Sequence, residues 1–169
     1  MLHNLLVVIC FLIILPSNAF SKDIQFHFDK RYDFYSDSEH LGVKGGKRYF
    51  YKHSTFFKKA LKDENFEASN YYLQCQTGVE SQLIVKLEPS FFYNPLMQIM
   101  YANLKYYVYG PDKKLLQSEK LSLEKITYFP ARSDIQLKDI YVEFLNQIES
   151  NLSGINVNGI LDGDFCKSI

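Results

Sequence analysis

The sequence predicts an α+β fold: a mostly antiparallel sheet of about four to five strands, with two helices packed on one face. The first observation is a polar–apolar alternation along residues 82–114, which is typical of half-buried strands. The second is a helical spacing of apolar residues in residues 56–64 and 133–152. Because strands and helices neither alternate strictly nor separate along the chain, an α+β arrangement is favoured.

Two long strands within residues 82–114 form the centre of the predicted sheet. We expect them to join across residues 89–95 and to end at the turn Gly110-Pro111-Asp112. One face carries aliphatic and other buried-type side chains: Leu83, Val85, Leu87, Met100, Ala102, Leu104, Tyr106 and Val108. The opposite face of the second strand carries Ile99, Tyr101, Asn103, Lys105, Tyr107 and Tyr109. The first face is therefore the predicted core.

Three further strands are expected in the sheet. Alternation over residues 23–29 predicts a first strand, and residues 66–73 a second. Residues 115–123 form the return strand after the turn, with Leu115, Leu121 and Leu123 facing inward. Between the first strand and the first helix, residues 30–53 form a long loop with a short strand near residues 49–51.

The two helices have recognisable starts and apolar stripes. Ser54 or Thr55 is expected to cap a helix over residues 56–64. The second helix, residues 133–152, begins with a Ser133–Gln136 capping box and ends at Gly154. Its wide apolar face predicts packing against the sheet.

The N-terminus has the features of a secretory signal peptide. Residues 5–15 are an unbroken apolar run, followed by Pro16 and the small residues Ser17-Asn18-Ala19. We expect residues 1–19 to be this signal peptide and residues 20–169 to form a single exported α+β domain. The run is shorter than the roughly 20 residues that span a bilayer, so no stable membrane span is expected after cleavage. The alternative is an uncleaved anchor, because no Lys or Arg precedes the run.

Two cysteines, Cys75 and Cys166, remain after the predicted signal peptide. In an oxidising compartment the simplest expectation is that they pair as a disulfide. The alternative is two free or intermolecular thiols. No Cys-x-x-Cys or His-x-x-x-His motif is present, so we expect no metal site and no cofactor.

Two surfaces are candidates for binding a partner. The first is a tyrosine ladder, since tyrosine supplies contact area at low entropic cost. It comprises Tyr101, Tyr107 and Tyr109, joined by Phe92 and Tyr93. Alternatively, these rings belong to a second buried face or lie under the long loop. The second surface is the basic–aromatic run of residues 47–53, including Lys47 and Arg48, whose alternative is a solvated loop rim.

Several function classes are disfavoured by composition and motifs. The chain of 169 residues has a formal net charge of zero, which argues against a nucleic-acid partner. Residues 42–48 lack the spacing of a phosphate-binding loop, and no Gly-x-Ser-x-Gly elbow occurs. Asp162-Gly163-Asp164 lacks the further ligands of a calcium loop. The sequence therefore favours a non-enzymatic protein.

In its order of elements, the segment of residues 54–152 resembles the small α/β domains of outer-membrane accessory lipoproteins. The residues that carry this likeness are a helix ending at Leu61, a strand, a hairpin with a Gly-Pro-Asp turn and a closing amphipathic helix. The resemblance implies a fold only, because it includes no functional motif.

The leading hypothesis is an exported, periplasmic or secreted, non-enzymatic protein that binds another envelope or secreted protein. One alternative is an immunity or inhibitor protein of the same compartment. Another is a small secreted hydrolase that uses His40 or His53 of the long loop. The oligomeric state is left open.

Overall fold

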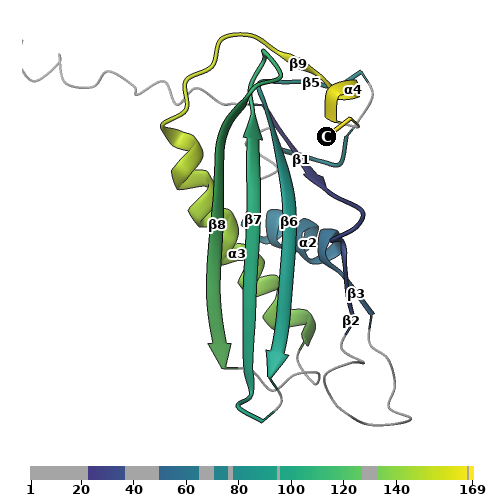
Figure 1. The fold of residues 1–169 in the computed structure, drawn as a ribbon, viewed down its shortest axis with the longest axis vertical. Coiled ribbons are helices and arrows are strands. Elements are labelled where there is room, and N and C mark those ends of the chain that lie inside the picture. Colours follow the sequence, from purple (N-terminus) through teal and green to yellow (C-terminus); the bar gives the residue numbers. More distant parts are fainter. Residues whose placement is uncertain are drawn as a thin grey trace, which may run out of the picture.

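A computed structural model describes residues 23–36, 50–64, 71–75, 78–94, 96–126, 133–166 and 168–169. It contains a five-stranded sheet in the order β4-β1-β6-β7-β8 (Figure 1). The strands are β1 (Ile24–Phe28), β4 (Tyr71–Leu73), β6 (Leu83–Asn94), β7 (Ile99–Tyr109) and β8 (Leu115–Ile126). The two long ladders, β6–β7 and β7–β8, are antiparallel, whereas β1 pairs in parallel with β4 and with β6. The predicted α+β class, with a mostly antiparallel sheet, is confirmed.

Two short ribbons and three helices complete the described structure. Antiparallel pairs join β2 (Phe34–Ser36) to β3 (Phe50–Lys52), and β5 (Glu80–Ser81) to β9 (Leu161–Asp162). The short strand expected near residues 49–51 corresponds to β3. The helices are α2 (His53–Asp63), α3 (Ser133–Ser153) and α4 (Gly163–Cys166). The predicted Ser133–Leu152 helix is therefore confirmed to within one residue at its end.

Helices α2 and α3 pack against each other and against the same face of the sheet (Figure 1). Their apolar stripes meet the alternating inward residues of the strands, as expected for amphipathic helices on a half-buried sheet. Phe57 and Ala60 of α2 are fully buried, and so are Tyr141 and Phe144 of α3. Aromatic rings dominate this core, with Phe26 lying edge-on to Phe57 at a centroid distance of 4.9 Å.

The first long strand does not end at Pro89, where the sequence predicted a connection. It continues to Asn94, and Pro89 pairs in register with Leu104 of β7. A proline is tolerated there because the pairing of β6 with β1 ends at Leu87. Beyond that residue, β6 has a strand neighbour on one side only among the described residues.

The start of α2 differs from the prediction, because its cap comes from a distant residue. The N-cap residue is Lys52, whose side chain makes no capping hydrogen bond. Instead Asp33 Oδ1 accepts from the backbone N–H of Ser54 at 2.7 Å, and Asp33 Oδ2 accepts from the Ser54 hydroxyl at 2.9 Å. The backbone oxygen of Asp33 also accepts from the N–H of His53. Asp33 thereby satisfies donors that a helix N-terminus leaves unpaired.

The predicted disulfide between Cys75 and Cys166 is present, with the two Cα atoms 5.3 Å apart. It joins the segment after β4 to α4 and closes a loop across 91 residues. Cys166 packs with Ile84 and Leu161 in a second, smaller buried cluster. The bridge thus holds the C-terminal segment against the end of the sheet.

The predicted signal peptide, residues 1–19, lies outside the described residues. Among the helices that the structure does describe, none is both long and apolar enough to span a membrane.

Replacing Asp33 with alanine should destabilise the protein by about 1–2 kcal/mol, as expected for the loss of a helix cap. The Asp33→Asn variant retains an acceptor for the Ser54 N–H and should lose less. Urea unfolding followed by circular dichroism measures both values. Equal stability of the alanine variant and the wild type would contradict the assignment of Asp33 as the cap of α2.

Removing the disulfide in a Cys75→Ser/Cys166→Ser double variant should cost about 4–5 kcal/mol, because the unfolded chain regains the freedom of a 91-residue loop. The same measurement on reduced wild-type protein provides the control. A double variant as stable as the oxidised protein would show that the C-terminal segment contributes nothing to the cooperative fold.

Candidate binding face

The sheet face opposite α2 and α3 is the candidate site, and we call it the open face. Figure 1 shows both helices behind β6, β7 and β8, and no described helix covers the middle of these strands on the near side. Side chains at alternate positions of the three strands point to this face, because successive side chains in a strand alternate between faces. The open face has an ionic half next to β1 and an apolar half at the β6–β7 turn.

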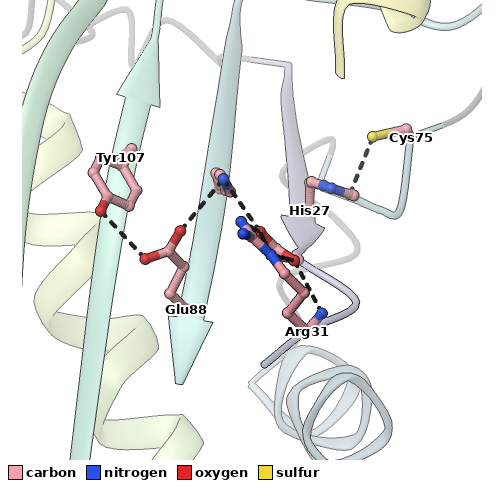
Figure 2. Close-up of polar contacts among 7 residues, drawn as sticks. His27, Arg31, Cys75, Glu88 and Tyr107 are labelled. Atoms are coloured by element: carbon pink, nitrogen blue, oxygen red, sulfur yellow. Dashed lines mark hydrogen bonds and ion pairs between the residues drawn. The ribbon is translucent and has the colours of Figure 1, made fainter. Parts of the chain in front are cut away.

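The ionic half is a chain of charged groups that runs from β1 to β7 (Figure 2). Arg31 Nη2 donates to Asp29 Oδ2 at 2.6 Å. Lys86 Nζ lies 3.4 Å from Asp29 Oδ2 and 3.3 Å from Glu88 Oε1, so it bridges the two carboxylates. The Tyr107 hydroxyl donates to Glu88 Oε2 at 3.2 Å. Four side chains from β6, β7 and the end of β1 are thus connected through one lysine.

This network holds its members in their charged forms. The hydrogen bond from Arg31 holds the pKa of Asp29 well below its usual range. Burial lowers the pKa of Lys86, but hydrogen bonds to Glu88 and Asp29 outweigh that effect, so its pKa lies above the ordinary value. Both groups therefore remain charged at neutral pH. Arg31 is the well-exposed member, with 73% of its side chain accessible, whereas Asp29, Lys86 and Glu88 keep only 10–15% of theirs.

The apolar half lies at the end of the sheet where β6 turns into β7. Phe92 and Tyr101 are directly paired in register, with ring centroids 6.1 Å apart. Ile99 is paired in the same way with Ile126 of β8. We call this group, with the two exposed residues of the turn, the hairpin-end patch: Phe92, Leu96, Met97, Ile99, Tyr101 and Ile126.

The patch is well exposed. Leu96 is 95% exposed, Ile126 80%, Met97 57% and Phe92 42%. Asn94 orders the turn, since its Oδ1 accepts from the backbone N–H groups of Leu96 and Met97. Isolated exposed apolar residues are ordinary, but several of them gathered at one end of a sheet are typical of an interaction surface.

The structure separates the residues of the predicted tyrosine ladder. Tyr101 and Phe92 lie in the hairpin-end patch, and Tyr107 belongs to the ionic network. Tyr109 packs against Phe165 of α4 with centroids 5.6 Å apart, so the C-terminal segment covers part of it. Tyr93 is only 3% exposed and lies in the core beneath the helices. The prediction that Tyr93 belongs to the tyrosine ladder is therefore wrong, because its side chain is part of the core.

Residues 47–49 of the second predicted surface, with Lys47 and Arg48, lie outside the described residues, whereas residues 50–52 form β3 and His53 begins α2. The charged bridge through Lys86 and the exposed apolar residues Leu96, Met97 and Ile126 are not evident from the sequence alone. The alternation of the first strand puts Lys86 and Glu88 opposite its apolar face, but the link from Lys86 to Asp29 depends on the parallel pairing of β1 with β6. Ile99 pairs with Ile126 because β8 continues to Ile126, whereas the return strand was predicted to end at residue 123.

One group of side chains has the residue types of a metal site. Ligand atoms of His27, Cys75 and Cys166 lie within 4.8 Å of one another. However, the two sulfurs are bonded to each other, and a metal requires thiolates. His27 Nδ1 lies 3.2 Å from Cys75 Sγ (Figure 2), and burial, together with Lys86, lowers the pKa of its imidazole. In the oxidised protein the His27 imidazole therefore lies against the Cys75–Cys166 disulfide.

A cleft of about 700 Å³ lies beside this cluster, between the end of β1 and the start of α2. Acidic and basic side chains line it together, among them Asp29, Arg31, Asp33 and Lys52. Asp29 and Asp33 are occupied by Arg31 and by the α2 cap, respectively. The described lining thus consists mainly of groups engaged in structural contacts.

His53, one of the two histidines of the hydrolase hypothesis, is buried at the start of α2 and is only 2% exposed. Its ring lies edge-on to Phe91, and its Nδ1 lies 2.7 Å from the Tyr141 hydroxyl. Burial raises the pKa of Tyr141, so the hydroxyl keeps its proton. Burial lowers the pKa of His53 to about 3, so the imidazole is neutral over the physiological range. His40 lies outside the described residues.

Comparison with known proteins does not identify a family. No protein-family model matches the sequence, and no curated protein matches it. A solved structure described as "Crystal structure of uncharacterized protein" aligns with 78% of this chain and 88% of its own length, at 7% identity and a TM-score of 0.38. A likeness at that level carries no argument about this chain.

The buried His53 predicts a stability loss on the acid side. The unfolded state takes up a proton near the ordinary His pKa of about 6.5, whereas the folded state does so only near 3. The free energy of unfolding should therefore fall by about 1.4 kcal/mol per pH unit as the pH drops from about 6 towards 4. Urea unfolding at several pH values measures this slope.

The His53→Asn variant keeps a side chain that can hydrogen-bond to the Tyr141 hydroxyl and does not titrate, so its slope should be shallower. Because the pKa of His27 is also lowered, a His27→Asn variant serves as the comparison. A wild-type slope that His53→Asn leaves unchanged would show that His53 becomes protonated in the folded protein.

Proposed function

We propose that this chain is an exported, non-enzymatic protein that binds another envelope or secreted protein through the open face of β6, β7 and β8. The observation that carries the proposal is the pairing of an exposed apolar patch with a charged network on the sheet face whose middle no described helix covers. Apolar aromatic anchors beside a polar margin are the usual composition of protein-binding surfaces.

The two halves of the face have different roles in this proposal. Phe92, Tyr101 and Ile126 provide area that loses water on contact, which is the main source of affinity. Arg31, held in place by Asp29, provides an exposed charge at a defined position that rejects a mismatched partner. The charged groups of the network already pair with one another. A partner therefore needs only a surface whose electrostatic potential is complementary to that of the network.

Export is supported by two independent features. The apolar run of residues 5–15, followed by small residues, matches a secretory signal. The Cys75–Cys166 bridge is compatible with an oxidising compartment such as the periplasm or the extracellular space.

Site-specific photo-crosslinking in intact cells tests the proposal. Two variants are made, one with a benzophenone amino acid in place of Phe92 and one with it in place of Ile126. Both should form an adduct with the same partner protein, which mass spectrometry identifies. The same probe at Lys58, on the exposed side of α2, is the matched control and should not yield that adduct. An absence of adducts from both patch positions, or identical adducts from Lys58, would contradict binding at this face.

With the captured protein purified, a Phe92→Ser/Ile126→Ser variant should bind it at least tenfold more weakly, because two exposed apolar anchors are lost. Isothermal titration calorimetry measures this change. An unchanged urea midpoint is the folding control, since both side chains are exposed in the free protein.

A further inference from the structure

The strand β8 forms one edge of the sheet and is the basis of a second interaction surface. It is 12 residues long, and no described strand pairs with its outer side. Figure 1 shows it running along the border of the sheet beside β7. Such an edge presents a row of backbone N–H and C=O groups that another strand can pair with. The opposite edge, β4, has only three residues.

The sequence of β8 is complementary to itself when the strand is reversed. Residues 119–125 are Glu-Lys-Leu-Ser-Leu-Glu-Lys, with Ser122 at the centre. In an antiparallel pair of two such strands related by a two-fold axis at Ser122, Glu119 faces Lys125 of the second copy. Likewise Lys120 faces Glu124, and Leu121 faces Leu123. Opposite charges directly across a strand pair stabilise it, and like charges destabilise it.

The charges also select this register. If the axis is moved to Leu121 or to Leu123, each of the four charged residues faces an uncharged side chain. Only the register centred on Ser122 pairs all four charges with opposite ones. Charged residues on an edge strand commonly prevent pairing. A self-complementary order has the opposite effect, because it favours a second copy of the same strand.

Two of the charges are also available for a partner. Lys120 and Glu124 are exposed on the open face, and their side chains make no hydrogen bond or ion pair within the part of the chain that the structure describes. Lys120 lies directly across from Lys105 of β7, so two like charges are adjacent. A carboxylate from a second copy would offset this repulsion.

The other two charges face the helix layer and already have partners. Glu119 accepts from the Tyr106 hydroxyl and from Asn151, and Lys125 pairs with Glu143 of α3. They remain compatible with the centred register, because each would face a residue of opposite charge. The Lys120–Glu124 pairs on the open face would therefore decide whether dimerisation is favourable.

We propose that β8 pairs with β8 of a second copy about a two-fold axis at Ser122, which joins the two five-stranded sheets into one continuous sheet. Because directly opposed residues share a face, both helix layers lie on one side and both open faces on the other. This pairing involves the outer edge of β8. The turn residues of the hairpin-end patch, Leu96 and Met97, remain accessible in the dimer. The pairing therefore does not depend on the proposed partner of the open face.

Engineered crosslinking tests the register. In a Ser122→Cys variant, the new thiol faces its own copy with Cα atoms about 4.5–5.5 Å apart, within disulfide range. Mild oxidation should give a covalent dimer on a non-reducing gel. Ser118→Cys is the matched control, because it lies on the same face but roughly 27 Å from its counterpart in this register. Failure of Ser122→Cys to crosslink, or equal crosslinking of Ser118→Cys, would overturn the proposed pairing.

Charge reversal tests the complementarity by sedimentation velocity over a range of concentrations. The wild type should show a concentration-dependent dimer. Lys120→Glu and Glu124→Lys should each weaken it at least tenfold, because two opposite pairs become like pairs. The double variant Lys120→Glu/Glu124→Lys restores opposite charges and should recover the dimer.

Lys58→Glu, on exposed α2, is the control for a general change of charge and should dimerise like the wild type. A wild type that sediments as a monomer at every concentration overturns the proposal. So does a double variant as weak as the single ones, because the pairing would then not depend on this charge order.

Discussion

The register between β6 and β7 is the constraint on which the rest of the structure depends. It places Val85 across from Val108 beneath the helices and Lys86 across from Tyr107 on the open face. A slip of one residue would exchange the two faces of β6. Lys86 and Glu88 would then enter the apolar core under α3, where unpaired charges are costly. The open face and the core are therefore fixed together by the same eleven paired positions.

The faces of the hairpin could be predicted because alternation with period two is visible in the sequence itself. Tyr93 could also have been placed, since Leu87, Phe91 and Tyr93 continue one alternation through Pro89. Treating Pro89 as a break in the strand hid that continuity. Leu115 was predicted to face inward but is 52% exposed, because the register shifts between Val108 and Tyr109 of β7. A bulge of this kind leaves no clear trace in local sequence.

The contacts that build the candidate site were not predictable, since they join residues far apart in the chain. Lys86 meets Asp29 because β1 lies parallel to β6 with Phe28 beside Leu87. Asp33 caps α2 because the chain returns through β3 to the same place. Each contact involves one polar residue that resembles many others on the surface. Only the parallel pairing of β1 with β6 and the β2–β3 ribbon, which sequence periodicity does not specify, identify the two pairs.

Strand β8 contributes to both proposed surfaces, and this sharing has a structural consequence. Ile126 lies in the hairpin-end patch, and Lys120 and Glu124 lie on the edge six and two residues before it. In the centred dimer, Ile126 of one copy faces Ser118 of the other, so each patch gains a neighbouring strand on its outer side. The two patches then lie at opposite ends of one wide face, separated by the paired charges. A dimer would thus present two equivalent apolar patches related by two-fold symmetry, which suits a partner that is itself symmetric or repeated.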